Sequence, residues 1–195
     1  VGILGSGPGT GNGQFDAPYD LVILASGETY VVDTLNYRIQ KFDSNGNYVT
    51  KWGTYGAVYV NKEFYFPISI TTDVSGNLYV LDNQYDRVVR FDSSGNYLNA
   101  IPNIAFPSGT PSEIIIATGV TVAGTNVYVS DNNFQNGTIK RFDLTGNLIS
   151  NYVGSNQAGS GAFAYPSHVA MQGGNILVAL TSGYLVKKYN ASFGY

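Results

Sequence analysis

Three aspartates recur at a spacing of 49 residues, and carboxylates at equal intervals are the first candidates for chemistry in this sequence. They are Asp33, Asp82 and Asp131. If the segments that carry them converge, three carboxylates can hold Ca²⁺ together with backbone oxygens. The alternative is structural, because an aspartate at the end of a strand can accept backbone N–H bonds in the loop that follows. Recurrence at equivalent positions favours the structural role, so these residues are weak metal candidates.

Other catalytic side chains are scarce. The chain has one histidine, His168, and no cysteine, which leaves little for a Ser–His–Asp triad and nothing for a thiolate nucleophile. We expect the imidazole to be packed or hydrogen-bonded within a sheet. Glu28, Glu63 and Glu113 are not paired as general acid–base catalysis requires. We therefore expect no enzyme activity and no cofactor, and a metal-assisted lyase or hydrolase is the least favoured function.

The glycine-rich stretch GSGPGTGNGQF, residues 5–15, has the composition of a phosphate-binding loop. It contains neither G-x-G-x-x-G nor G-x-x-x-x-G-K-[ST], and no helix-forming segment follows it. The stretch GSNQAGSGAFAYP, residues 154–166, is similar. Phe15, Phe64 and Phe163 each precede a proline by three residues. The stretch is therefore predicted to be a connector between structural units.

The amino-acid composition limits the classes of partner that the protein is expected to bind. Of 195 residues, 12% are charged, and 10 Lys and Arg against 13 Asp and Glu give a net charge of −3. This balance argues against nucleic acid, whose binding depends on basic side chains at phosphates. No apolar run reaches the ~18–20 residues of a membrane-spanning helix. The chain begins at Val1 without a recognisable signal peptide, so we expect that one was removed or that the sequence is part of a longer protein.

The elements that must position these residues follow from an internal repeat. TYVVDTLNYRIQKFDSNGNYVTKWG from Thr29 is matched from Leu78 and from Val127, and more distantly by ILVALTSGYLVKKYNASFGY from Ile176. Each repeat reads as four short strands rich in β-branched and aromatic residues, the first beginning after a proline or glycine. Four-stranded units at this spacing are typical of propeller blades. We predict one all-β domain over 1–195, a β-propeller with blades at about 14–53, 63–101, 112–154, and 162–195 plus 1–5.

The segment NYRIQKFD, residues 36–43, resembles the NHL repeat, and RVVRFD, residues 87–92, keeps its arginine and phenylalanine. The third repeat has Thr138 at the arginine position, and the fourth loses both Asp and Arg. The resemblance implies a propeller fold, but NHL propellers serve as enzymes, RNA binders, sensors and adhesion-type modules. RNA-binding members present a basic face, and zinc-dependent lyases of this type need several histidines. Here the basic residues alternate along the third strands, which indicates exposed blade edges or salt bridges between blades.

The two chain ends complement each other. The last repeat stops where a fourth strand is expected, and VGILG at the N-terminus has the character of that strand. This assembly strand comprises Val1, Gly2, Ile3, Leu4 and Gly5. It can complete the last blade of its own chain, or that of a neighbouring copy by strand addition. A third possibility is that the sequence is a window from a longer tandem array.

These observations favour a non-enzymatic, extracellular or cell-surface propeller that acts in structure or protein interaction. Its partner is expected to be itself, through exchange of the terminal strand, or another protein. Low charge, no cysteine and abundant Tyr, Asn and Gly suit a surface protein, and two sequons, at Asn136 and Asn190, matter if the protein is exported. The alternative is a ligand-binding or sensing module of a larger surface protein.

Overall fold

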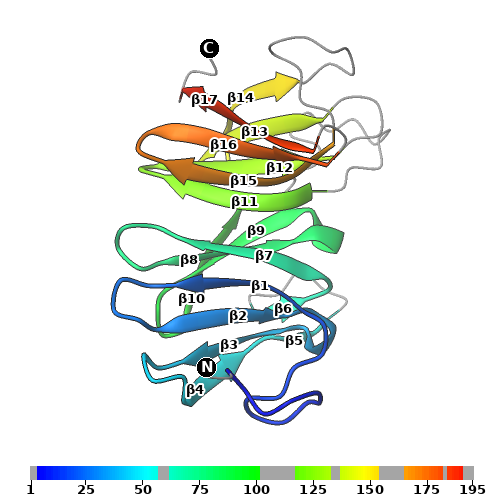
Figure 1. Ribbon diagram of the computed structural model, residues 1–195, viewed down its shortest axis with the longest axis vertical. Coiled ribbons are helices and arrows are strands. Elements are labelled where there is room, and N and C mark those ends of the chain that lie inside the picture. The colour runs from blue at the N-terminus through cyan, green and yellow to red at the C-terminus, as the bar shows by residue number, and fades with distance from the viewer. Residues whose placement is uncertain are drawn as a thin grey trace. The chain divides into compact units, whose positions relative to one another are not determined.

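The computed structural model describes residues 4–56, 62–101, 117–132, 137–153, 165–181 and 184–190 (Figure 1). Its regular structure is almost entirely β, with two short 3₁₀ turns, Thr34–Asn36 and Asn83–Tyr85. The chain has the fold of a four-blade β-propeller, built from consecutive antiparallel sheets, as the repeat predicts. No helix in the described residues is long and apolar enough to cross a membrane.

Each blade is one antiparallel sheet whose strands follow in chain order. Blade 1 contains β1 (Pro18–Ile23), β2 (Thr29–Asp33), β3 (Arg38–Phe42) and β4 (Tyr48–Trp52). Blade 2 contains β7 (Pro67–Thr72), β8 (Leu78–Asp82), β9 (Arg87–Phe91) and β10 (Tyr97–Ile101). Blade 3 contains β11 (Ala117–Ala123), β12 (Asn126–Asp131), β13 (Thr138–Asp143) and β14 (Leu148–Val153). The described part of blade 4 contains β15 (Pro166–Gln172), β16 (Asn175–Leu180) and β17 (Leu185–Asn190).

The first strand of every blade carries a register shift one residue after its start. The shifts lie between Pro18 and Asp20 and at the matching positions of β7, β11 and β15. A bulge of this kind bends the strand and re-aims the side chain that follows it. Strand β11 begins at Ala117, two residues before Gly119, the glycine after which the repeat predicts this first strand.

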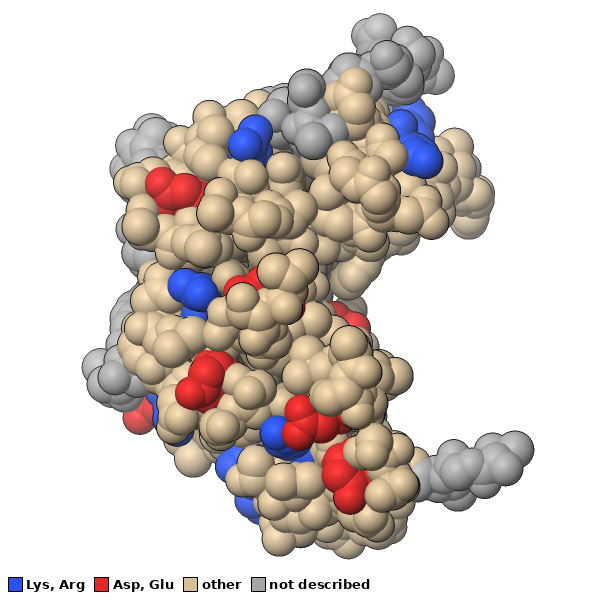
Figure 2. Space-filling model, turned by 90° about the vertical axis from the view of Figure 1, so that its left-hand side faces the viewer, with Lys and Arg blue, Asp and Glu red and all other residues tan. Residues whose placement is uncertain are grey.

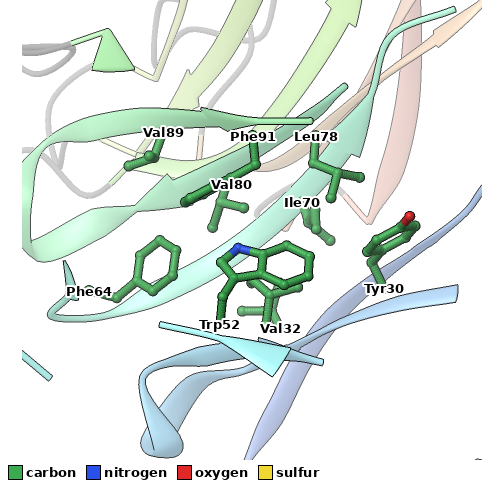
Figure 3. Packing of buried hydrophobic residues seen from close by; sticks show 10 residues of the cluster. Tyr30, Val32, Trp52, Phe64, Ile70, Leu78, Val80, Val89 and Phe91 are labelled. Carbon is green, nitrogen blue, oxygen red and sulfur yellow. The ribbon is translucent and has the colours of Figure 1, made fainter. Parts of the chain in front are cut away.

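The chain divides into two compact units. One comprises Val1–Tyr85 with Val89–Asn99, and the other comprises Asp86–Val88 with Ala100–Tyr195. Within the first unit, one apolar cluster joins blade 1 to blade 2. Figure 3 shows Trp52 of β4 among side chains of the neighbouring blade. The cluster consists of Tyr30, Val32, Ile39, Trp52, Phe64, Ile70, Leu78, Val80, Val89 and Phe91.

The second unit repeats this packing. Tyr128 and Ile139 of blade 3 lie in one cluster with Val169, Ile176 and Val178 of blade 4. Tyr128 occupies the position of Tyr30 in its repeat, and Val169 the position of Ile70. Adjacent blades in both units are therefore joined by side chains at the same repeat positions. Burial of several such side chains at ~1.5–3 kcal/mol each makes these junctions a large part of the stability.

Four turns share the sequence D-x-x-G-N and the same hydrogen bonds. In the first, Oδ1 of Asp43 accepts from the backbone N–H groups of Asn45 and Asn47, and Oδ2 accepts from the side-chain amide of Asn47. The glycine, Gly46, has φ +84°, a left-handed value that favours glycine. The other three turns begin at Asp73, Asp92 and Asp143. The sequence predicts the glycine's role but not that of the aspartate.

Candidate functional site

The glycine-rich connector encloses the guanidinium of Arg38. The Nη1 atom donates to Thr10 O at 2.7 Å, and Nη2 donates to Gly11 O at 2.9 Å and Gln14 O at 2.8 Å. The Nε atom donates to Oδ2 of Asp33 at 2.7 Å. The predicted connector is thus fixed to blade 1 by a buried cation whose charge is balanced by a buried carboxylate.

Asp33 has protein donors at both carboxylate oxygens. The Oδ1 atom accepts from Asp16 N at 2.7 Å, and Oδ2 accepts from Asn36 Nδ2 and Gln40 Nε2, both at 2.9 Å, in addition to Arg38. The Asp33 carboxylate thus holds the connector to blade 1, directly through Asp16 N and indirectly through Arg38. The predicted backbone N–H donor is present, but it lies before the first strand of the blade and not in the loop after β2.

Asp82 and Asp131 occupy the same position in blades 2 and 3. Asp82 accepts from the backbone N–H of Phe66 at 2.8 Å, and Asp131 from Lys140 Nζ at 2.8 Å. Both carboxylates are buried. Among the residues that the structure describes, no three His, Asp or Glu side chains gather so as to hold a metal ion. The structural role of these aspartates therefore has direct support from their contacts, while a metal site formed by all three stays an untested prediction.

His168 differs from its sequence prediction. It lies in β15 of blade 4 and is exposed, not packed inside the sheet. Its Nδ1 atom lies beside Gly119 of β11, only 2.8 Å from where a side-chain carbon on that glycine would be. Because Gly119 has no side chain, the imidazole fits beside β11.

The basic side chains of the third strands fall into two classes. Arg38, Arg87 and Lys140 are buried, so the prediction of exposed edges is wrong for them. Lys41 instead pairs with Glu28 at 2.7 Å in its own blade and donates to Ser93 O of blade 2 at 3.1 Å. On the face shown in Figure 2, basic and acidic groups are scattered among uncharged side chains. No basic surface for nucleic acid forms on that face.

A row of tyrosines covers part of the first unit, and sequence reasoning missed it. Ring centroids are 4.9 Å apart for Tyr37 and Tyr55, 5.5 Å for Tyr55 and Tyr65, and 5.6 Å for Tyr65 and Tyr85. Tyr55 and Tyr65 are exposed, and the charge of Tyr65 raises the pKa of Tyr55. Exposed tyrosines are favoured where proteins bind partners. The row joins the 3₁₀ turns to β5 (Thr54–Tyr55) and to the segment after β6 (Glu63–Phe64).

Two sheet faces are open although the same faces of other blades are buried. The front face of a blade is the one that bears Leu21, Ile70, Val120 or Val169, which pair with equivalent valines of the second strand. Leu21 is 51% exposed, whereas the other three are at most 4% exposed. Ile23, on the same strand, is also exposed. Blade 1 therefore presents an apolar strip on a face that is buried elsewhere.

The back face of a blade is the one that bears Ile39, Val88, Ile139 or Val186. The first three are fully buried, and Val186 of blade 4 is 65% exposed. Leu177 and Ala179, on the neighbouring strand β16, are partly exposed. An isolated exposed apolar residue needs no explanation, but an apolar sheet face that is buried in equivalent blades is a candidate interaction site.

The remaining predicted sites are only partly described. Asn190 ends β17 and is exposed, whereas Asn136 lies outside the described residues. Val1, Gly2 and Ile3 of the assembly strand are outside them as well, and Leu4 and Gly5 form a bend near the turn at Gly46. Completion of blade 4 by the assembly strand stays a prediction.

Solved structures of similar fold are β-propellers of unlike function. A chain of a nidogen/laminin complex is matched with 15% identity and a TM-score of 0.63, over 91% of this chain and 61% of the other. A streptogramin B lyase is matched with 12% identity and a TM-score of 0.55, over 89% of this chain and 54% of the other. A catalytically inactive virginiamycin B lyase from Staphylococcus aureus, solved with quinupristin, is matched with 14% identity and a TM-score of 0.56. The match covers 89% of this chain and 55% of the other.

These likenesses show the fold alone, because every identity is low. The chain spans little more than half the length of the solved chains that it matches. No family model and no curated protein matches the sequence. The propeller fold is thus confirmed, and membership of the NHL family stays a prediction.

Proposed function

We propose that this chain is a non-enzymatic, NHL-like propeller module that acts by binding protein, first of all copies of itself, outside the cell. The observation that carries the proposal is the open front face of blade 1, where Leu21 is 51% exposed and the equivalent residues of three blades are buried. An exposed apolar face that equivalent blades bury is a candidate binding site.

Three further features support a binding role. The aspartates that recur through the repeat accept hydrogen bonds from neighbouring segments of the chain, which is a structural role. The single histidine and the absence of cysteine leave few groups for covalent or acid–base chemistry. Low charge and two sequons suit an exported protein. One of the similar propeller chains belongs to a nidogen/laminin complex, so this fold is compatible with binding protein.

The native mass in solution tests the proposal. We expect light scattering on a gel-filtration column to give a mass well above the 20.9 kDa of one chain at micromolar concentration. Dilution should shift the mass downwards, because an interface between copies obeys mass action. A constant single-chain mass from nanomolar to high micromolar concentration would contradict self-assembly.

A second candidate function is a ligand-binding or sensing module, and the tyrosine row favours it. Tyr55 and Tyr65 present exposed rings that are held in place by Tyr37 and Tyr85. A fixed aromatic surface loses little conformational entropy on binding. Replacement of Tyr55 and Tyr65 by serine should leave the native mass unchanged if the row serves a ligand, and should lower it if the row serves contact between copies.

A further inference from the structure

Tyrosine is the main side chain in this sequence that an oxidant can attack. The sequence has no cysteine, one methionine and one tryptophan, against 16 tyrosines. The tryptophan, Trp52, is only 7% exposed within the apolar cluster of the first unit. Thiol and thioether groups are common targets of oxidation in proteins, and both are scarce here. Oxidative modification of this protein is therefore expected at tyrosines, above all where two of them lie close together.

The tyrosine row lies entirely within the first compact unit, so its geometry belongs to that unit alone. Its members are Tyr37, Tyr55, Tyr65 and Tyr85, and the centroids of neighbouring rings are 4.9–5.6 Å apart. Rings in contact can exchange an electron, so a radical formed on one ring can reach the next. Tyr55 and Tyr65 are the two middle rings of the row.

The backbone holds these two middle rings together. Strands β5 and β6 pair in parallel, with Tyr55 opposite Phe64. The Gly56 N–H donates to Phe64 O at 3.4 Å, and the Tyr65 N–H donates to Oδ1 of Asp82 at 3.2 Å. The ring centroids of Tyr55 and Tyr65 are 5.5 Å apart as a result.

The hydroxyl ends of Tyr55 and Tyr65 also meet. The charge of Tyr65 and a hydrogen bond between the two side chains both raise the pKa of Tyr55. The hydroxyl of Tyr85 instead donates to the backbone oxygen of Gly56. The ring carbons next to the hydroxyl carry much of the unpaired spin of a phenoxyl radical. In the Tyr55–Tyr65 pair these reactive carbons therefore lie near each other.

We propose that Tyr55 and Tyr65 are the site of an oxidative cross-link, a dityrosine, which a peroxidase forms with hydrogen peroxide. Each phenol loses one electron and one proton, and the two phenoxyl radicals join in a new C–C bond between ring carbons next to the hydroxyls. Each of these carbons passes its hydrogen to the phenolic oxygen, which restores both hydroxyls. Hydrogen peroxide takes up the two electrons and two protons and becomes two molecules of water.

The cross-link joins the segment that leaves blade 1 after Trp52 to the segment that enters blade 2 at Pro67. It closes a short loop between Tyr55 and Tyr65, so it restrains the unfolded chain as a disulfide does. The inference goes beyond the proposed binding function, because it assigns a modification site and a covalent bridge between neighbouring blades.

Peptide mass spectrometry after treatment with a peroxidase and hydrogen peroxide tests the inference. We expect the chain to lose the mass of two hydrogen atoms and to gain the fluorescence of dityrosine. Trypsin cuts after Lys62, so Tyr55 and Tyr65 fall in separate peptides that the cross-link joins. Fragmentation of the joined pair should place the link at these two residues.

Conservative variants show whether these two hydroxyls are needed. Tyr55→Phe and Tyr65→Phe keep the packed ring but cannot form a phenoxyl radical, so each should lose the joined peptide pair. The matched control is Tyr184→Phe, because Tyr184 is 97% exposed and lies in the second unit. This control should keep the wild-type yield of the joined pair.

Two further measurements separate coupling directed by the fold from random oxidation. In a mixture of isotope-labelled and unlabelled protein, a link within one chain joins peptides that carry the same label. In urea, the yield of the Tyr55–Tyr65 pair should fall. A pair within one chain that both phenylalanine variants lose supports the inference. Absence of the pair in treated wild-type protein, a pair that joins only different chains, or an equal yield in folded and unfolded protein overturns it.

Discussion

Arg38 is the residue that turns the glycine-rich connector into an ordered part of blade 1. Its guanidinium donates to three backbone carbonyls of the connector and to Asp33. Both side chains are buried, so neither charge is compensated by water. Since a buried ion pair tolerates loss of one partner poorly, the stability of the connector depends on this pair.

Replacement of Arg38 by methionine should lower the free energy of unfolding by about 3–5 kcal/mol, because the carboxylate of Asp33 is left buried without its cation. Urea unfolding followed by the fluorescence of Trp52, the chain's single tryptophan, measures the change. Lys51→Met is the control, since Lys51 is exposed and should change the stability by less than ~0.5 kcal/mol. Equal stability of the Arg38 variant and the control would show that the connector does not need the guanidinium.

The aspartates of the D-x-x-G-N turns make the folded chain less stable at acid pH. Hydrogen bonds from Asn47 lower the pKa of Asp43, those from Asn96 lower the pKa of Asp92, and those from Thr145 and Asn147 lower the pKa of Asp143. A carboxyl with a lower pKa in the folded than in the unfolded chain stabilises the fold above the unfolded pKa, near ~3.9. This contribution is lost as pH falls through the folded pKa.

We therefore expect the melting temperature to be nearly constant from pH 7 to about 5 and to fall steadily below about 4. NMR titration of the carboxyl carbons should place the midpoints of Asp43 and Asp143 below the value of an unfolded aspartate. Replacement of Asn147 by alanine removes the side-chain amide that donates to Asp143 Oδ2 and keeps the backbone donor, so it should move that midpoint upwards and leave that of Asp43 in place. Midpoints at the unfolded value would contradict the role assigned to the turns.

At the scale of elements, the turn between β9 and β10 is part of the junction between blades. Gly95 has φ +80°, and a side-chain carbon at this position would lie 2.6 Å from the indole ring of Trp52. Gly76 lies in the turn between β7 and β8 with the same φ of +80°, but its nearest neighbour would be 3.9 Å away. The two glycines differ in what they touch and not in backbone conformation, so they form a matched pair.

Gly76→Ala should cost ~1–2 kcal/mol, which is the penalty of the left-handed backbone for alanine. Gly95→Ala should cost ~1–3 kcal/mol more, because the methyl group displaces the indole ring. Denaturant unfolding measures both values, and the emission of Trp52 should shift in Gly95→Ala alone. Equal costs for the two variants would mean that the indole ring is not packed against this turn.

Most of the element order could be predicted from the sequence. Three features recur in the sequence: the repeat spacing, the Phe-x-x-Pro elements and the glycine turns. Because they recur at matching positions, they predict where the strands of each blade begin and end. The fold of the connector around Arg38 could not be predicted, since backbone carbonyls accept those hydrogen bonds and carry no side-chain signal. The tyrosine row was missed because its members come from four separate segments and follow no period.

At the scale of the whole molecule, the open faces could not be predicted either. Leu21 and Ile70 are similar aliphatic residues at the same repeat position, so their sequence context is alike. They differ in burial, with 51% of Leu21 and 4% of Ile70 exposed, and only the structure reveals this. We propose a binding function from that difference, since an exposed apolar face that is buried in equivalent blades is a candidate interaction site.

The native mass as a function of concentration tests self-association, the central claim, most directly. Light scattering on a gel-filtration column is run from nanomolar to high micromolar concentration. The account predicts a mass above the 20.9 kDa of one chain that falls on dilution, because association between copies obeys mass action. A constant single-chain mass over the whole range would contradict it.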